Sequence, residues 1–365
     1  MTSTPDAQAL ADRFRKAAAV THIASGDLSA LARDAFLLCG ISKSDAEDAA
    51  EIAVYAQLHG SDSHGAVHLP LYMTGLFDGT IKKAPNIVTT SGLPCCMVID
   101  ADNGLGLIAS RRAIDAAIGL AQTYGLGAVS VRNSSHFGVA GYYAGRAAAQ
   151  GLIAFAFTNA SPAIAPTGSK EPLLGTNPIG AAFPLPDADP IIIDMATAVV
   201  ARSRIRHMIA LGHSAIPEGW ALDPDGRPTT DPNIAVKGSI QPIGGPKGYA
   251  LSLIVELLCS ALSDGEPGFD VTYENVVKRP SGVSQFFLVM NPAGFAGLDR
   301  YGKRASHIAG VIKKAKPIDD ATAPRLPGAR GHDINRKSSA QGIAMFDALR
   351  HALKSVAELI EKRAT

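Results

Sequence analysis

The chain has 365 residues, 47% hydrophobic and 18% charged, so it can bury more than one core and is not a disordered type. Its 34 basic and 33 acidic residues give a formal net charge of +1, and this balance favours neither nucleic acid nor a membrane surface as a partner. The four cysteines include adjacent Cys95 and Cys96 but no CxxC pair, which is typical of reduced thiols. The amino terminus lacks the pattern of a signal peptide, so we expect a cytoplasmic protein.

The hydrophobic periodicity predicts helices near both chain ends and alternating strands and helices between them. Ser42 or Ser44 is placed to cap a helix that leads directly into a polar loop. Two segments, 159–180 and 220–231, are rich in Gly, Pro and turn residues and are predicted to be irregular. Helices are predicted at 27–38, 44–58, 108–124, 141–150, 195–211, 249–262, 302–314 and 340–362, and strands at 20–23, 97–100, 127–132, 152–158, 191–193 and 284–291.

The polar loop at 58–65, LHGSDSHG, concentrates side chains that can transfer protons. Its serines and aspartate can cap local amides, but this does not explain why His64 stands in a turn before Gly65. His59, His64 and His68 also suggest a zinc site as an alternative. Gly65 disfavours the helix that such a site needs, and no Glu lies between His64 and His68.

Two further candidate groups follow predicted strands. His136, in the turn NSSHFG, could either transfer a proton in a cleft or bond to the backbone as a structural histidine. Asp194 follows three isoleucines and is expected to be buried and paired with a hydroxyl, an imidazole or an amide, or to cap a following helix.

Several familiar motifs are incomplete. Gly104-x-Gly106-x-x-Ala109 resembles a dinucleotide fingerprint, but the next strand ends in Arg132-Asn133 without the expected acid, so a tight connection is the better interpretation. Lys247 lies in a glycine loop that is not a Walker motif, and no GxSxG is present. Four arginines could serve a 2′-phosphate or simply lie on a solvated surface: Arg132, Arg202, Arg204 and Arg206.

Six stretches together resemble the type-2 malate/L-lactate dehydrogenase family of NAD(P)-dependent oxidoreductases. They are HGSDSHGAVHLPLY, GAVSVRNSSHFGVAGYYA, TNASPAIAPTGSKEPLLGTNPIGAAFP, IIIDMATAVVAR, IPEGWALDPDGRPTTDP and GGPKGYALSLIVELL. The resemblance implies a mixed α/β fold with a non-Rossmann cofactor domain on a largely antiparallel sheet and a helical domain from both chain ends. The implied domains are 1–85, 86–300 and 301–365. It also implies NAD or NADP as cofactor, a small carboxylate substrate and a homodimer.

The resemblance also assigns site residues, and it leaves open whether His64 or His136 is the proton donor. The implied catalytic residues are Ser63, His64, His136 and Asp194, and the implied substrate contacts are His68, Thr176 and Asn177. The implied cofactor contacts are His136, Phe137, Gly138, Thr158, Asp194, Met195, Ala196, Lys247, Arg325, Pro327 and Gly328.

Two positions depart from the family pattern. His68 stands where members carry an Arg that grips the substrate carboxylate, so either another cation serves or the substrate differs. Ala329 replaces a Glu near the cofactor. The leading hypothesis is a dehydrogenase of a small 2-oxo or 2-hydroxy acid, with a cyclic 2-imino acid reductase as alternative and a histidine-based metal hydrolase as the rival from another class.

Overall fold

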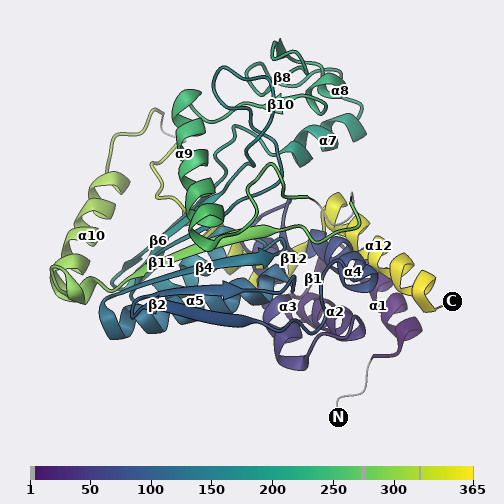
Figure 1. Ribbon diagram of the computed structural model, residues 1–365, viewed down its shortest axis with the longest axis horizontal. Helices are drawn as coiled ribbons and strands as arrows, with labels where there is room; N and C mark the ends of the chain where they lie inside the picture. The colour runs from purple at the N-terminus through teal and green to yellow at the C-terminus, as the bar shows by residue number, and fades with distance from the viewer. Residues whose placement is uncertain (1–4, 273–276, 320–321, 365) are drawn as a thin grey trace.

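Helices from both ends of the chain pack together into one layer of the computed structural model, which describes residues 5–272, 277–319 and 322–364 (Figure 1). The two ends are joined where β1 (His22–Ile23) pairs antiparallel with β12 (Ile343–Ala344). Ser42 caps α3, because its Oγ accepts a hydrogen bond from the Asp45 amide at 3.3 Å. The helices of this layer are α1 (Ala7–Ala19), α2 (Ser25–Leu38), α3 (Lys43–Leu58), the 3₁₀ turn η1 (Gly65–His68), α4 (Leu69–Asp78), α11 (Ala329–Gln341) and α12 (Asp347–Ala364).

A seven-stranded sheet lies beside the helical layer, with the order β2-β3-β4-β11-β5-β6-β7. Every neighbouring pair is antiparallel except β3 and β4, which are parallel and joined by helix α5 (Gly106–Tyr124). The expected non-Rossmann, largely antiparallel sheet is therefore confirmed. The strands are β2 (Val88–Leu93), β3 (Cys96–Asp100), β4 (Leu126–Ser134), β5 (Ile153–Thr158), β6 (Ile179–Leu185), β7 (Ala188–Met195) and β11 (Val283–Met290).

Both faces of the sheet are covered, and successive residues of β11 show this. Phe287 packs into the main core with α5 and α6 (Ala140–Ala148), whereas Phe286 joins Val255 and Cys259 on the opposite face. That opposite face is covered by α9 (Pro246–Glu256) and its π-helical continuation η2 (Leu257–Ala261). The Gly106 amide at the start of α5 donates to Ser135 Oγ, just after β4, at 2.8 Å. The glycines that resemble a dinucleotide fingerprint therefore form a tight connection between β3 and α5.

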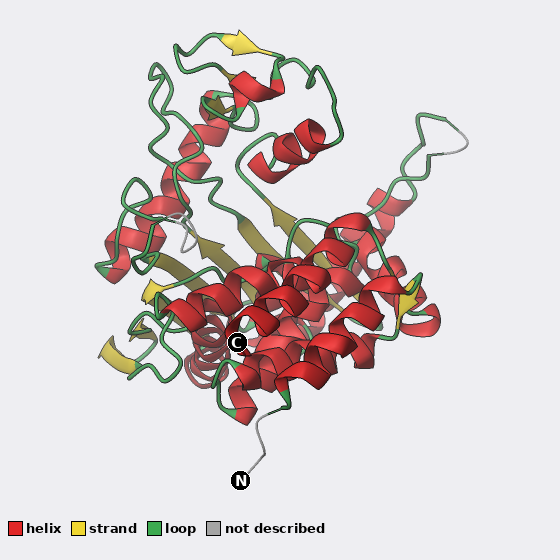
Figure 2. Cartoon of the chain, turned by 90° about the vertical axis from the view of Figure 1, so that its right-hand side faces the viewer, coloured by secondary structure: helices red, strands yellow, loops and turns green. Residues whose placement is uncertain are grey.

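A small excursion between β7 and α9 packs with Ala163, Ile164 and Leu174 around a second core and stands above the packed helices in Figure 2. Trp220 and Tyr249 pack against the buried residues of this core. No helix in the described ranges is long and apolar enough to cross a membrane. The excursion contains α7 (Arg202–Ala210), β8 (Ala221–Leu222), β9 (Pro228–Thr229), α8 (Pro232–Ala235) and β10 (Ser239–Ile240).

Several predicted elements are corrected. Strand β6 was not predicted: it begins in the last two residues of the segment predicted to be irregular and continues to Leu185, because its short apolar run pairs on both sides despite Gly180 and Pro184. The helix predicted at 195–211 begins only at residue 202, since the chain first completes β7. The helix predicted at 340–362 begins only at Asp347, as α12, because residues 340–341 end α11, which was not predicted, and Gly342 and β12 follow. Helix α10 (Leu298–Lys313) packs on the sheet, where Tyr301 Oη donates to Pro184 O at 3.2 Å, and α11 and α12 pack against the N-terminal helices.

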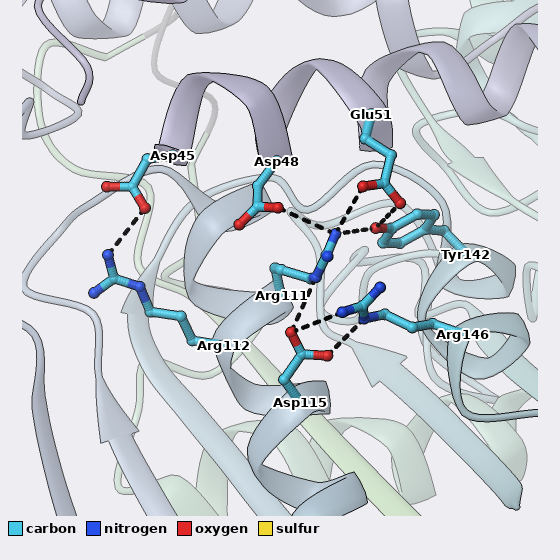
Figure 3. Close-up of polar contacts among 8 residues, drawn as sticks. All are labelled: Asp45, Asp48, Glu51, Arg111, Arg112, Asp115, Tyr142 and Arg146. Carbon is cyan, nitrogen blue, oxygen red and sulfur yellow. Dashed lines mark hydrogen bonds and ion pairs between the residues drawn. The ribbon is translucent and has the colours of Figure 1, made fainter. Parts of the chain in front are cut away.

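An ion network ties the helical layer to the sheet layer (Figure 3). Arg111 of α5 is at its centre, with a side chain only 11% exposed, and it reaches Glu51 of α3 at 3.2 Å and Asp115 at 3.0 Å. A buried guanidinium with several carboxylate partners fixes geometry better than an isolated surface pair does. The network therefore sets α3 against α5 and α6. Its other members are Asp48, Tyr142 and Arg146, and a separate ion pair of Asp45 with Arg112 crosses the same seam.

Candidate active site

The His64 loop is held rigidly at the end of α3. Gln57, which is buried, donates to His64 O at 2.7 Å and accepts from the Ala66 amide at 2.8 Å. Gly65 has φ +81°, and a Cβ there would lie 2.4 Å from Ala53 O. Only glycine meets both requirements, because L side chains rarely adopt positive φ and the helix leaves no space. The loop is therefore fixed to α3 from both sides.

Three histidines predicted from separate motifs form one cluster. His64 Nδ1 is 2.8 Å from Ser63 Oγ, so the serine orients the imidazole. The rings of His64 and His136 stack with centroids 5.6 Å apart, and those of His68 and His136 with centroids 4.8 Å apart. His59 lies elsewhere, against Tyr55 and His332. The described residues contain no group of three or more His, Cys, Asp or Glu arranged to hold a metal ion.

Two donors fix the tautomer of His136. Tyr72, 1% exposed, places its hydroxyl 2.7 Å from His136 Nδ1, and the Gly138 amide donates to the same nitrogen at 3.3 Å. A backbone N–H can only donate, so Nδ1 accepts and the neutral ring carries its proton on Nε2. His136 therefore presents an N–H donor to its surroundings.

Burial keeps the three histidines neutral. Desolvation lowers the pKa of His64, which Asp62 partly opposes, and it lowers the pKa of His136 well below the ordinary value. The pKa of His68 falls to about 3 through burial and the neighbouring His64. His68 Nδ1 is buried and has no hydrogen-bond partner. A neutral imidazole supplies neither the charge nor the fork of the arginine expected at this position.

Asp194 at the end of β7 is a second titratable group in the site. Its Oδ2 accepts from the Gly141 amide at 2.9 Å, in the first turn of α6. The side chain borders a cavity, so solvent reaches it there, but protein surrounds the rest and raises its pKa to about 6. The expected pairing with an amide is confirmed. Capping of the following helix is wrong, because α7 begins eight residues later, at Arg202.

Two connected cavities meet at the histidine cluster. The larger has a volume of about 470 Å³ and the smaller about 100 Å³, and both are lined by His64, Gly138, Thr176 and Pro178. The larger cavity also borders Ser63, Gly141, Asp194, Met195, Ala196 and Gly328, and the smaller borders His136, Phe137 and Thr158. Eleven of the predicted site residues thus line one or both of these neighbouring cavities.

The walls of the larger cavity fit a nicotinamide dinucleotide. A Cβ at Gly141 would lie 2.9 Å from Asp194 Oδ2, so the wall has to be bare backbone there. Gly60, Gly138, Gly328 and Gly331 line the same cavity, as does the amino end of α6. Backbone N–H groups at a helix start suit anionic and polar parts of a nucleotide. The volume is also in the range of cofactor sites.

The remaining predicted contacts lie outside these cavities. Asn177 is fully buried and donates to Glu256 Oε2 at 2.9 Å, so it supports the neighbouring Thr176 instead of facing the cavity. Lys247 is exposed at the start of α9. Arg325 is exposed and paired with Asp333, and Pro327 O accepts from the Ile192 amide at 3.3 Å. Ala329, which replaces the expected Glu, begins α11.

Three supporting residues escaped the sequence analysis: Gln57, Tyr72 and Glu256. Glu256 gave the clearest sign, because a single carboxylate in a strongly apolar helix has to be satisfied, and it accepts from Asn159, Asn177 and Gly268. Tyr72 stands four residues after His68, a spacing that places both on one helical face. Nothing in the sequence distinguishes Gln57 from an exposed helical glutamine.

A family model and individual known proteins match most of this chain. A family model described as malate/L-lactate dehydrogenase matches residues 23–354. The L-sulfolactate dehydrogenase of Methanocaldococcus jannaschii is 40% identical over 77% of this chain and 80% of its own length. A (2R)-3-sulfolactate dehydrogenase (NADP(+)) of Chromohalobacter salexigens is 39% identical over 82% of this chain and 87% of its own.

The relationship extends to an imine reductase and to a solved structure. A Delta(1)-pyrroline-2-carboxylate reductase of Ancylobacter novellus is 31% identical over 90% of this chain and 95% of its own length. The sulfolactate dehydrogenase structure from M. jannaschii superposes with a TM-score of 0.86, at 35% identity, over 93% of this chain and 97% of that one.

The fold and the site thus define a dehydrogenase with a non-Rossmann cofactor domain. The chain belongs to the malate/L-lactate dehydrogenase family. It is therefore an oxidoreductase that uses a nicotinamide cofactor, and this class replaces the metal hydrolase alternative.

Proposed function

We propose that this enzyme interconverts a small 2-hydroxy acid and its 2-oxo acid, with NAD or NADP as the redox partner. The observation that carries the proposal is the oriented histidine cluster, which lies where a cavity suited to a dinucleotide opens into a pocket of about 100 Å³. When bound, the nicotinamide ring accepts the hydride from the substrate carbon in oxidation and returns it in reduction. The protein has to orient the substrate and move one proton.

His64 is the proposed acid/base. It lines both cavities, whereas His136 lines only the smaller one. With the Nδ1 hydrogen donated to Ser63 Oγ, 2.8 Å away, Nε2 keeps a lone pair that accepts the hydroxyl proton of the substrate in oxidation. The same nitrogen returns that proton to the carbonyl oxygen in reduction. His136, with its proton on Nε2, donates a hydrogen bond that orients the substrate oxygen.

Asp194 is the proposed polar anchor of the cofactor end of the cleft. Its carboxyl lies in the wall of the larger cavity and is held by the Gly141 amide. With a pKa of about 6 it is mostly ionised at pH 7 and can accept hydrogen bonds from an amide or hydroxyl of a ligand. Met195 and Ala196, from the same strand end, complete this wall.

The test is the absorbance of the reduced nicotinamide with purified protein and a substrate panel. The panel contains oxaloacetate, sulfopyruvate, pyruvate and the two cyclic imino acids, with the matching hydroxy acids and NAD or NADP in reverse. Turnover of a 2-oxo acid supports the proposal. Turnover of the cyclic imino acids alone would show that the enzyme is an imine reductase. Absence of turnover and of cofactor binding would contradict the proposal.

We also propose a homodimer located in the cytoplasm. The face around α10 exposes large apolar side chains, including Phe295 at 69%, Leu298 at 58% and Val311 at 57%, which a second copy would cover. The four cysteines are free thiols, as expected in a reducing compartment. Light scattering after size exclusion should give twice the chain mass, and Val311→Glu should lower it; a monomeric wild type would contradict the dimer.

A further inference from the structure

A buried carboxylate at the end of α9 lies directly behind the walls of the smaller cavity. Glu256 is 5% exposed. Its Oε1 accepts from the Gly268 amide at 2.7 Å and from Asn159 Nδ2 at 3.3 Å, and its Oε2 accepts from Asn177 Nδ2 at 2.9 Å. All three partners are N–H donors, which is the set that a carboxylate needs when it is removed from water.

The three donors come from three segments that form walls of the smaller cavity. Asn159 lines this cavity itself, and Asn177 stands between two residues that line it. Gly268 stands three positions before the first lining residue of its segment, and a Cβ there would lie 2.8 Å from Glu256 Oε2. One carboxylate therefore joins walls that are far apart in the sequence. The segments are 158–161, 176–178 and 268–272.

The two asparagine amides cannot turn to suit a different partner. Asn177 Nδ2 also donates to Ser252 O at 3.0 Å, and Asn159 Oδ1 accepts from the Ser284 amide at 2.8 Å. A backbone carbonyl only accepts and a backbone N–H only donates, so both amide orientations are fixed. Both asparagines therefore present N–H groups to Glu256, and only a side chain with two acceptor oxygens satisfies them.

The backbone that carries Glu256 is itself held in place. Glu256 is the last residue of α9, and the next turn, η2, is π-helical, a feature that is frequent at functional sites. Ser260 Oγ donates to Glu256 O at 2.8 Å across this turn. One turn earlier, Ser252 Oγ donates to Gly175 O at 3.2 Å. Two successive turns of one helix thus hold the segment that contains Asn177.

We propose that Glu256 is a positioning residue for the proposed reaction, because its carboxylate holds three walls of the smaller cavity in the arrangement that orients the substrate against His64 and His136. The inference rests on the proposed function and adds to it a residue behind the walls that contact the substrate. A fully satisfied buried network specifies one arrangement, and misplacement of a substrate by about 1 Å can lower the rate by about 10²-fold. The larger cavity depends on Glu256 less, since most of its walls come from α3, α6, β7 and α11.

The experiment uses Glu256→Gln, which keeps the size of the side chain but turns an NH₂ group toward one of the three donors. We expect kcat/KM for the 2-oxo acid that wild type reduces to fall by roughly 10–100-fold. The Kd of NADH, measured by fluorescence titration, should change by less than about threefold, because most of its site is remote from the network. Asp34→Asn is the matched control: Asp34 is also buried, at 8% exposure, and accepts from Arg13 and Arg33 in the helical layer. It should lower Tm without lowering kcat/KM.

Gly268→Ala is the second variant, and it tests the inference if Glu256→Gln does not fold. It keeps the carboxylate but displaces it through the added Cβ, so kcat/KM should fall in the same direction, by roughly 3–10-fold. Hydrogen exchange of the free protein requires no turnover. In either variant, exchange should be faster in segments 158–161, 176–178 and 268–272 and unchanged in the His64 loop.

Wild-type kcat/KM in both variants, or a loss that Asp34→Asn shares, would overturn the inference. Faster exchange with unchanged kinetics would also overturn it and leave Glu256 a structural role only. A wild type that reduces none of the acids contradicts the proposed function instead. Exchange then decides the inference: faster exchange confined to the three segments supports it, and equal exchange in wild type and variants contradicts it.

Discussion

The two walls of the active-site cleft are built in different ways. The His64 wall belongs to the main core, where Gln57 and the tight approach of Gly65 to α3 hold the loop. The other wall of the larger cavity includes Ala201, the N-cap of α7, and α7 belongs to the excursion, whose core is separate. The chemistry is thus placed on the rigid wall, and the excursion can change without disturbing it.

The largest expected effect comes from removing the acid/base. His64→Ala should lower kcat by about 10²–10⁴-fold, because a positioned acid or base contributes on that scale. Far-ultraviolet circular dichroism should be unchanged. His213→Ala, an exposed histidine of the excursion, is the control and should keep wild-type turnover. A decrease of less than tenfold for His64→Ala would transfer the role to His136.

The rigidity of the His64 wall is tested with a pair of glycines. Gly65→Ala should destabilise the protein by about 2–4 kcal/mol, since it combines a strained φ with a steric clash against α3. Gly212→Ala has a similar φ, +76°, in the excursion but open space around it, so it should cost about 1 kcal/mol. Thermal unfolding of both variants measures the difference. Equal effects would show that the close packing at Gly65 contributes little.

The pH dependence of oxidation should reflect the lowered pKa of His64. A base has to be deprotonated, and a base with a lowered pKa stays deprotonated to lower pH. Log kcat/KM for the hydroxy acid should therefore be level from pH 8 to below 6.5, the ordinary histidine value, and should fall only at lower pH. An inflection above pH 7 would be inconsistent with His64 as the base in the free enzyme.

The smallest effect concerns Asp194 and stability. Its folded pKa of about 6 lies above the ordinary value of 3.8, so the folded state holds the proton more tightly and wild-type stability falls as pH rises between these values. Asp194→Asn has no carboxyl to titrate at this position, so its stability does not fall over this pH range for this reason. Its Tm relative to wild type should therefore rise from pH 4 to pH 6 and then level, while activity decreases. A difference in Tm that is independent of pH would contradict the raised pKa.

Much of the fold and several residues of the candidate site were predictable, because short local sequence patterns indicate them. Ser42 with its acidic first turn indicates the start of α3, and the apolar periodicity indicates α5 and the sheet strands. The turn motifs containing His64 and His136 each suggest a proton-transfer group. Their stacking across 72 residues of sequence depends on how the loop after α3 meets the turn after β4, which no local pattern specifies.

The failures share a physical cause, which is pairing with distant segments. Strand β6 forms because β5 and β7 satisfy its backbone on both sides, despite Gly180 and Pro184. Asn177 was expected to face the substrate, but Glu256 of α9, 79 residues away, holds it in the interior.

The ion network around Arg111 has a consequence for the alignment of the active site. His64 follows α3, whereas Gly138 and Asp194 are held by the elements around α6. The proposed catalytic groups therefore lie on two layers, which the ion network of Figure 3 joins. Four carboxylates and three guanidinium groups span the seam between those layers. Because most of these carboxylates are exposed to solvent, dissolved salt weakens the ion pairs that join the two layers. We therefore expect turnover to decrease as ionic strength rises, through residues that touch neither ligand.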